Sequence, residues 1–290
     1  MKSALRKSAI PHDQVFVVKE LHEPHFDPNW HFHPEYQLFA VLEGSGTRFV
    51  GDHIQPFGPG ELVFTGPDLP HLWRSDNAYF APGSGLMTHG IVVYFHADML
   101  GSHFFEKKEM YKLRLLLDRA RRGIEAGPET SARVIPMLQQ LVRCEGFAGV
   151  RLLLDLLDTL SQASDLRLIV AENYSNLNEE KDTRRINDVH HYVLDHFRTG
   201  VSLETAASIA NMSPAAFSRY FSARANKNFS TFVSEVRIGH ACRLLLEDQL
   251  SVIQISYECG FRTLSNFNRQ FKAVTGKSPR AYKKAYEGVM

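Results

Sequence analysis

Two patterns of apolar and polar positions divide the chain. Up to about residue 100, short apolar runs alternate with turns rich in glycine and proline, and many short strands with such punctuation are typical of a β-sandwich or barrel. After about residue 106, apolar residues instead recur at spacings of three and four, which predicts helices. The predicted strands cover residues 14–19, 36–42, 47–50, 61–65, 71–74 and 90–96.

Three amphipathic helices are predicted between about residues 106 and 165. Apolar stripes at helical spacing usually pack inside the same molecule, and the surplus here is a candidate dimer interface. The stripes are Leu113, Leu116, Leu117 and Ala120; Val134, Leu138, Leu141 and Val142; and Val150, Leu153, Leu154, Leu157 and Leu160.

The C-terminal part of the chain contains an internal repeat. Arg219 and Phe221 recur fifty positions later as Arg269 and Phe271, whereas residues just upstream recur at an offset of forty-nine. The two copies therefore differ by one residue in a turn. Each copy is read as helix, tight turn, helix, which is the shape of a helix-turn-helix reader of the DNA major groove. We expect these units at about residues 202–225 and 251–275.

Capping and turn residues support both units. Ser202 and Ser251 are candidate N-caps of the first helices, and Ser213 is the candidate N-cap of the second helix in the first copy. Asn211 and Gly260 tolerate the left-handed backbone of a tight turn between helices. Between the units, residues 230–247 predict a helix about 27 Å long. That length suits two readers set about one DNA turn, roughly 34 Å, apart.

The outward-facing side chains of the two second helices are candidate base readers. Arginine makes bidentate contacts with guanine, and asparagine suits adenine. A solvated helix face or a phosphate contact is the alternative for each arginine, but Arg219 and Arg269 recur at one register, which favours base contact. The candidate readers are Ala215, Ser218 and Arg219 in the first unit and Leu264, Ser265, Asn268 and Arg269 in the second.

Residues 184–286 resemble the DNA-binding domain of the AraC/XylS family of transcription regulators. Three motifs carry the resemblance: Ser-Pro-Ala-Ala-Phe-Ser-Arg-Tyr-Phe at 213–221, Gly-Phe-Arg-Thr-Leu-Ser-Asn-Phe-Asn-Arg-Gln-Phe-Lys at 260–272 and Gly-Lys-Ser-Pro-Arg-Ala-Tyr at 276–282. It implies the same reader positions, double-stranded DNA as partner, a homodimer and a contact with RNA polymerase. Ala215 and Ser218 are smaller than the readers common in that family, so specificity in the first unit rests mainly on Arg219.

Charge is distributed unevenly. Residues 183–290 hold fifteen Lys/Arg and eight Asp/Glu, a net charge of +7, whereas residues 1–182 carry −6. The overall charge of +1 conceals this asymmetry. Since DNA binding releases counterions, we expect one half of the chain to bind DNA with an affinity that falls steeply with salt.

A second motif lies in the β-rich part. His31, His33 and Gln37 fall in Trp-His-Phe-His-Pro-Glu-Tyr-Gln at 30–37, and His71 follows Thr-Gly-Pro-Asp-Leu-Pro at 65–70. On an extended segment, residues two apart face the same side. These motifs resemble those of the cupin barrel, in which two histidines and a carboxylate from the first motif and a histidine from the second line the barrel mouth. The resemblance places His31, His33, Gln37 and His71 there.

Gln37 stands where a metal-binding cupin has glutamate. Three imidazoles can hold Zn, Fe, Ni or Cu, but loss of the anionic ligand weakens charge neutralisation and removes a general base. We therefore expect no cofactor and a non-enzyme, with the histidines binding a small polar effector and Trp30, Phe39 and Trp73 as apolar walls. A divalent metal on His31, His33 and His71 is the alternative, as is a barrel wall with no ligand.

The predicted fold is a two-domain α+β protein. A cupin-like ligand-sensing and dimerisation domain is expected at 1–170, with its barrel at about 12–100 and helices at about 106–165; the linker is expected at 171–183 and an all-α DNA-binding domain at 184–290. Cys144, Cys242 and Cys259 are read as reduced core thiols. With no evident signal peptide or membrane span, a cytoplasmic location is expected.

Three functions are compatible with these features. The leading hypothesis is a transcription regulator whose effector, a sugar or related metabolite by the resemblance, binds in the barrel. The others are a metal-dependent cupin enzyme fused to a DNA-binding domain, and a constitutive regulator with a structural barrel.

Overall fold

The computed structural model describes residues 10, 11, 13–171, 180–225 and 227–286. The chain forms two compact units, an N-terminal one up to residue 171 and a C-terminal one from residue 180. Of the linker expected at 171–183, residues 172–179 lie outside the described residues, and residues 180–183 belong to the first helix of the C-terminal unit. No helix in the described ranges combines the length and the apolar character needed to cross a membrane.

Two β-sheets build the N-terminal unit. One has six strands in the order β1-β7-β2-β5-β8-β9, and the other has three in the order β4-β3-β6. β2 pairs antiparallel with both β5 and β7, which places it at the centre of the larger sheet. The strands are β1 (Phe16–Glu23), β2 (Tyr36–Glu43), β3 (Gly46–Val50), β4 (His53–Phe57), β5 (Leu62–Thr65), β6 (His71–Ser75), β7 (Thr88–Phe95), β8 (Ile124–Ala126) and β9 (Leu166–Leu168).

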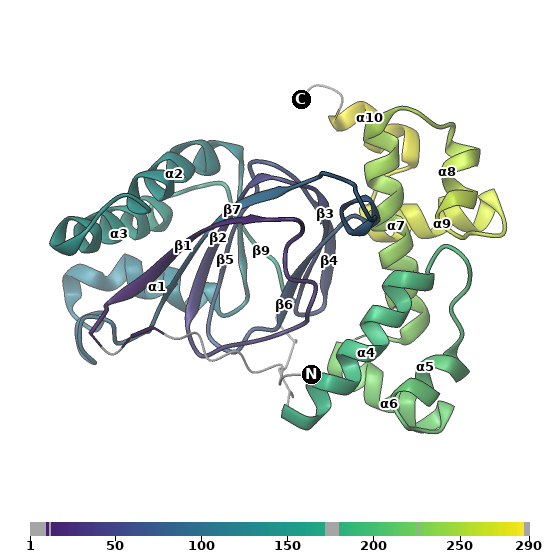
Figure 1. Ribbon diagram of the computed structural model, residues 1–290, viewed down its shortest axis with the longest axis horizontal. Helices are drawn as coiled ribbons and strands as arrows, with labels where there is room; N and C mark the ends of the chain where they lie inside the picture. The colour runs from purple at the N-terminus through teal and green to yellow at the C-terminus, as the bar shows by residue number, and fades with distance from the viewer. Residues whose placement is uncertain (1–9, 12, 172–179, 226, 287–290) are drawn as a thin grey trace. The chain divides into compact units, whose positions relative to one another are not determined.

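The larger sheet is buried on both faces. Along β2, Leu38 and Ala40 belong to one apolar cluster and Phe39 and Val41 to another, because successive side chains of a strand point to opposite faces. The first cluster includes apolar residues of α1 (Tyr111–Ala120), α2 (Pro128–Leu141) and α3 (Gly146–Ser161), and these helices cover that face (Figure 1). The second contains Val50, Phe57 and Trp73 of the smaller sheet. This double burial explains why residues 38–42 of β2 form a continuous apolar run.

The predicted strands are present, with ends shifted by a few residues, and three further strands are found. β4, β8 and β9 were not predicted. β8 and β9 have only three residues each, too few to show alternation, and they form because they extend the edge of the larger sheet next to β5. Their positions therefore depend on tertiary pairing.

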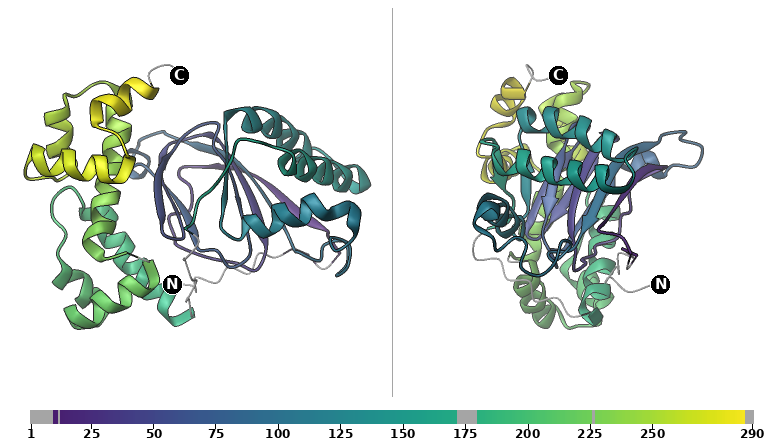
Figure 2. Two further views of the ribbon diagram at one scale, coloured as in Figure 1. Left: turned by 180° about the vertical axis from the view of Figure 1, so that it is seen from behind. Right: turned by 90° about the vertical axis from the view of Figure 1, so that its left-hand side faces the viewer.

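Seven helices of the described residues form the C-terminal unit. α7 lies between a group made of α4, α5 and α6 and a group made of α8, α9 and α10 (Figures 1 and 2). The bounds are α4 (Glu180–His196), α5 (Leu203–Ile209), α6 (Pro214–Ala225), α7 (Phe229–Glu247), α8 (Val252–Glu258), α9 (Leu264–Thr275) and α10 (Pro279–Tyr286). The fold class predicted from the sequence, a β-rich cupin region followed by helices and a helical C-terminal unit, is confirmed.

The internal repeat is visible in the packing of the C-terminal unit. The rings of Phe217 and Phe221 have centroids 5.6 Å apart, and those of Phe267 and Phe271 are 5.5 Å apart. All four side chains are fully buried. The N-terminal end of α7 supplies Phe229 and Phe232 to the first aromatic cluster, and its C-terminal half supplies Ile238, Ala241, Cys242 and Leu245 to the second core.

Candidate functional site

Each repeat forms a helix-turn-helix unit with the three predicted caps and a further cap at Thr263. Ser202 and Ser251 accept hydrogen bonds from the backbone of Thr205 and Gln254, so they begin α5 and α8. In the second helices, Ser213 Oγ and Thr263 Oγ1 accept from backbone N–H groups at 3.3 and 3.2 Å. Such caps satisfy backbone donors that the helix leaves without partners.

The two turns have the same geometry. Asn211 has φ of 55° and Gly260 has φ of 77°, the left-handed conformation that the sequence predicted. The backbone N–H of each donates to the carbonyl three residues earlier, at 2.9 Å in both units. Residues that follow the turns then lie at equivalent places on α6 and α9.

The candidate base readers lie on the accessible faces of α6 and α9. Ala215, Arg219, Ser265, Asn268 and Arg269 are exposed, and Ser218 and Leu264 are half-buried. Phe217 and Phe267 lie on the opposite, buried faces. The seven residues thus divide between two equivalent surfaces, which is the arrangement required of two recognition helices.

Two of the candidate readers have hydrogen-bond partners within their own helices. Ser218 Oγ donates to the carbonyl oxygen of Pro214 at 2.9 Å, which leaves its oxygen as an acceptor for other groups. Arg269 Nη2 donates to Asn266 Oδ1 at 2.9 Å. This contact orients the guanidinium along the exposed face of α9.

The histidine cluster consists of His31, His33, His71 and Gln37. Nitrogen atoms of the three histidines lie within 4.8 Å of one another, and all four residues are buried. Gln37 belongs to β2 and His71 to β6, whereas His31 and His33 precede β2 and lie outside any regular strand. His31 forms an isolated antiparallel bridge with His71, so backbone pairing brings the two motifs together.

Backbone carbonyls determine which nitrogen atoms face the cluster. The Nδ1 atoms of His31, His33 and His71 lie 2.8, 3.1 and 2.7 Å from carbonyl oxygens. Since a carbonyl only accepts, each Nδ1 carries the hydrogen, and the neutral imidazole keeps its lone pair on Nε2. The Nε2 atoms of His33 and His71 lie 3.1 and 3.2 Å from Oε1 of Gln37. Turning this amide by 180° places its NH₂ group there, where it donates to both lone pairs.

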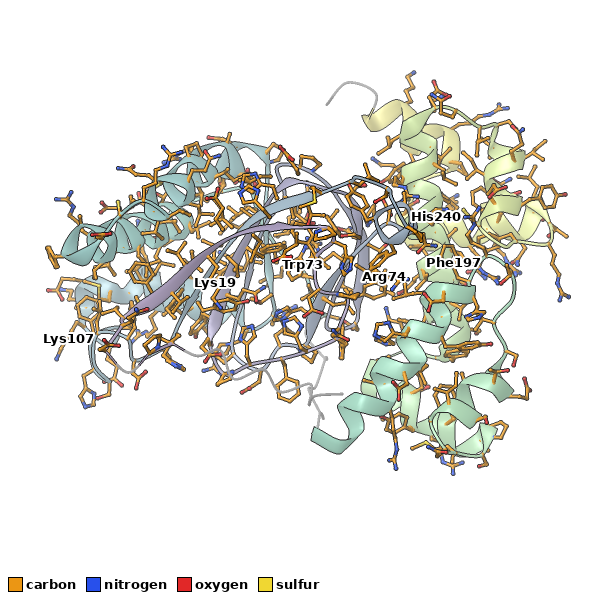
Figure 3. All side chains as sticks on the ribbon, in the orientation of Figure 1. Lys19, Trp73, Arg74, Lys107, Phe197 and His240 are labelled. Atoms are coloured by element: carbon orange, nitrogen blue, oxygen red, sulfur yellow. The ribbon has the colours of Figure 1, made fainter. Side chains whose placement is uncertain are left out.

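The predicted apolar walls differ in their relation to the cluster. Trp73 packs on His71 with ring centroids 5.7 Å apart and therefore adjoins the cluster, whereas Phe39 packs on Trp73 at 4.7 Å. Trp73 is on β6, in the β-rich unit, as Figure 3 shows. Trp30 is buried beside His31 in the sequence.

Two charged groups near the cluster, Glu61 and Glu35, had no role assigned to them from the sequence. Glu61 Oε2 accepts from Trp73 Nε1 at 2.8 Å, and Glu61 also pairs with the fully buried Arg48 at 2.6 Å. Burial raises the pKa of Glu61, an effect that Arg48 and then the Trp73 hydrogen bond oppose. Glu35, buried within the first motif, lies 3.3 Å from His33 Nδ1 and 3.6 Å from His96 Nε2. In the sequence, the position of Glu35 between His33 and Gln37 was the feature that could have indicated its place near the cluster.

Comparisons with known proteins agree with the two sets of residues. Residues 206–285 match the family described as a helix-turn-helix domain, and residues 19–78 match the family described as a cupin domain. The class of protein is therefore a helix-turn-helix DNA-binding protein with a cupin domain. Within that class, the chain is a transcription regulator of the AraC type.

Several relatives are named as transcription regulators. The uncharacterised regulator YfiF of Bacillus subtilis is 24% identical over 269 residues, which cover 91% of this chain and 81% of that protein. The activator RhaS of an Enterobacter species is 29% identical over 40% of this chain and 42% of its own length. Other matches are also partial: that to YobQ of Bacillus subtilis covers 32% of this chain and 38% of that protein.

Two solved structures are also similar. One is the DNA-binding domain of AdpA in complex with a target DNA, 31% identical, covering 34% of this chain and 90% of that chain with a TM-score of 0.33. The other is fatty-acid-bound ToxT from Vibrio cholerae, 14% identical, covering 94% of this chain and 96% of that chain with a TM-score of 0.36.

Proposed function

We propose that this chain controls transcription in response to a small polar effector held by the histidine cluster. α6 and α9 enter two major-groove segments of one duplex, and Arg219, Asn268 and Arg269 make the base contacts. The function is binding, not catalysis. A homodimer and a contact with RNA polymerase complete the proposed assembly, as the resemblance to AraC-type regulators implies.

The convergence of one nitrogen atom from each of three buried histidines is the observation that carries the effector proposal. Backbone carbonyls engage the three Nδ1 atoms, and Gln37 contacts the Nε2 atoms of His33 and His71, so the cluster suits a ligand that donates hydrogen bonds in place of the Gln37 amide or beside it. A hydroxylated compound such as a sugar meets this requirement. Trp73, which packs on both His71 and Phe39, provides apolar surface beside the cluster.

A divalent metal is the second candidate occupant, favoured by the same three nitrogens. His31, His33 and His71 would hold the ion, and fixed Nδ1–H groups orient histidine ligands in metal sites. The donor set fits Zn or another metal that accepts imidazole. Gln37 in place of a carboxylate leaves the charge of the ion uncompensated, which favours the neutral effector.

A thermal-shift screen of the full-length protein, metal-stripped and metal-loaded, tests these alternatives. A ligand at a hundred times its dissociation constant adds about 2.7 kcal/mol to the stability of the native state. The proposal expects a hydroxylated metabolite to raise the melting midpoint, His71→Ala to remove that shift, and the same compound to change operator affinity in a fluorescence-anisotropy titration. His103→Ala, an exposed histidine elsewhere, is the control.

Other outcomes of the screen select other functions. Stabilisation by metals alone, together with turnover of a substrate, would support the cupin enzyme. Absence of any stabilising compound, with operator binding intact, would support a constitutive regulator whose barrel is structural. Absence of any salt-dependent preference for a promoter duplex would refute base reading by α6 and α9.

A further inference from the structure

A second group of metal-ligating side chains lies on the surface of the N-terminal unit, apart from the histidine cluster. β1 is the edge strand of the larger sheet and pairs antiparallel with β7. His22 of β1 and His89 of β7 are direct partners in this register. Glu20, two residues before His22, shares the same face of β1, because side chains alternate along a strand. Two strands therefore place three potential ligands together.

The three side chains already contact one another. Glu20 Oε1 lies 2.9 Å from His89 Nε2 and 3.8 Å from His22 Nε2. The two imidazole rings stack with centroids 4.0 Å apart and an interplanar angle of 23°. One ligand atom from each residue can be chosen so that all three lie within 4.8 Å.

These separations are close to those that a tetrahedral zinc ion requires. Bonds of about 2.0–2.2 Å at the tetrahedral angle set neighbouring ligand atoms about 3.4 Å apart. The two oxygen-to-nitrogen distances lie on either side of this value, so rotation about side-chain bonds is sufficient to complete the geometry. The register of the β1–β7 pairing already holds the three side chains close to the positions that the ion requires.

The donor set also differs from that of the buried cluster. Two imidazoles and a carboxylate form a common set of three protein ligands for Zn²⁺, and the carboxylate offsets part of the ionic charge. The side chains of His22 and Glu20 are 62% and 39% exposed, which leaves room for water or another group at a fourth position.

We propose that Glu20, His22 and His89 form a surface site for a divalent transition-metal ion, with Zn²⁺ as its probe. The bound ion joins the edge strand β1 to β7 and keeps one open coordination position. Binding therefore stabilises the β1 edge of the larger sheet.

Zinc titration of the full-length, chelator-treated protein tests the site. We expect His22→Ala and His89→Ala each to lose one equivalent of Zn²⁺ relative to the unmodified chain, measured by competition with a chromogenic chelator. His103→Ala is the matched control, since His103 and Glu106 are an exposed pair with two ligand atoms 2.9 Å apart. That variant is expected to retain the full equivalent.

Comparison of these variants isolates the surface site, because the histidine cluster is intact in all of them. A second measurement is the melting midpoint in Zn²⁺, which we expect to rise in the unmodified chain and to rise less in His22→Ala. Because His22 is exposed, this variant is expected to fold. Equal zinc content in the unmodified chain and either His22→Ala or His89→Ala would overturn the proposal.

Discussion

Gly260 lies against the carbonyl oxygen of Phe197. A Cβ atom at position 260 would lie 2.5 Å from that oxygen, and Arg237 Nε donates to the same oxygen at 2.9 Å. The end of α4 is thereby joined to the turn of the second helix-turn-helix unit and to α7. Phe197 also packs on His240 of α7 (Figure 3).

Gly260→Ala is expected to destabilise the C-terminal unit by roughly 2–4 kcal/mol. The positive φ disfavours a Cβ atom, and the carbonyl cannot move without losing its bond to Arg237. Urea unfolding measures the loss. Asn211→Gly at the equivalent turn is the control, expected to change stability by only a few tenths of a kcal/mol. Equal effects of the two substitutions would contradict this account of the turn.

Arg269→Ala is expected to weaken binding to the specific operator by about 1–3 kcal/mol and to relax preference at one base position. Arg219→Ala should act at another position. Lys272→Ala, on the exposed surface of the same helix as Arg269, is the comparison, expected to weaken all sequences alike. Binding to a library of operator variants separates these results. Uniform weakening by Arg269→Ala would identify a phosphate contact instead.

The stability of the C-terminal unit is expected to fall as the pH decreases below about 6.5. Burial lowers the pKa of His190 from 6.5 to about 3 and that of His240 to about 4. The unfolded chain therefore binds more protons than the folded chain in this window, so acid favours unfolding by about 1 kcal/mol per pH unit and group. Hydrogen exchange of α4 and α7 peptides between pH 7.5 and 5 measures the slope. His190→Gln should reduce it, and an unchanged slope would exclude His190 as its source.

Arg48→Met is expected to cost about 3–5 kcal/mol. Arg48 pairs with Glu61 at 2.6 Å and with Glu125 at 3.1 Å, and its removal leaves Glu61 with less compensation in a buried setting. The double variant Arg48→Met/Glu61→Gln should recover part of the loss. Thermal unfolding of both variants tests this, and equal midpoints would argue against coupling between the two side chains.

Cys144 is expected to react first with a thiol reagent. Burial raises the pKa of Cys242 and of Cys259 to about 12, whereas Cys144 is half-buried. A thiolate is the reactive form, so two thiols should be slow in the native protein. Labelling with Ellman's reagent before and after denaturation counts them. Rapid native modification of more than one cysteine would contradict the core location.

Local signals explain what was predictable from the sequence. Ser202 and Ser251 act as caps, and Asn211 and Gly260 form turns, through interactions within a few residues. The ends of the helices in the two helix-turn-helix units could therefore be predicted to within a few residues from the sequence. The histidine motifs were also recognisable, because the residues within each motif are close along the chain.

Long-range pairing explains what was missed. Arg48 finds Glu61 thirteen residues away and Glu125 seventy-seven residues away, and no local pattern connects them. The position of Gln37 between His33 and His71 likewise depends on the bridge between His31 and His71. β8 and β9 are strands only because the sheet edge is available to them.

α7 contributes to both cores of the C-terminal unit as one continuous helix of 19 residues. The length of this helix sets the rotation of α6 relative to α9 about the α7 axis. Inserting one residue in α7 would rotate one helix-turn-helix unit relative to the other by about 100° while moving it only about 1.5 Å along the axis. Seven inserted residues, about two turns, would nearly restore the rotation but add about 10 Å. If α6 and α9 read two half-sites as proposed, the length of α7 sets both the spacing of those half-sites and the side of the duplex from which each is read.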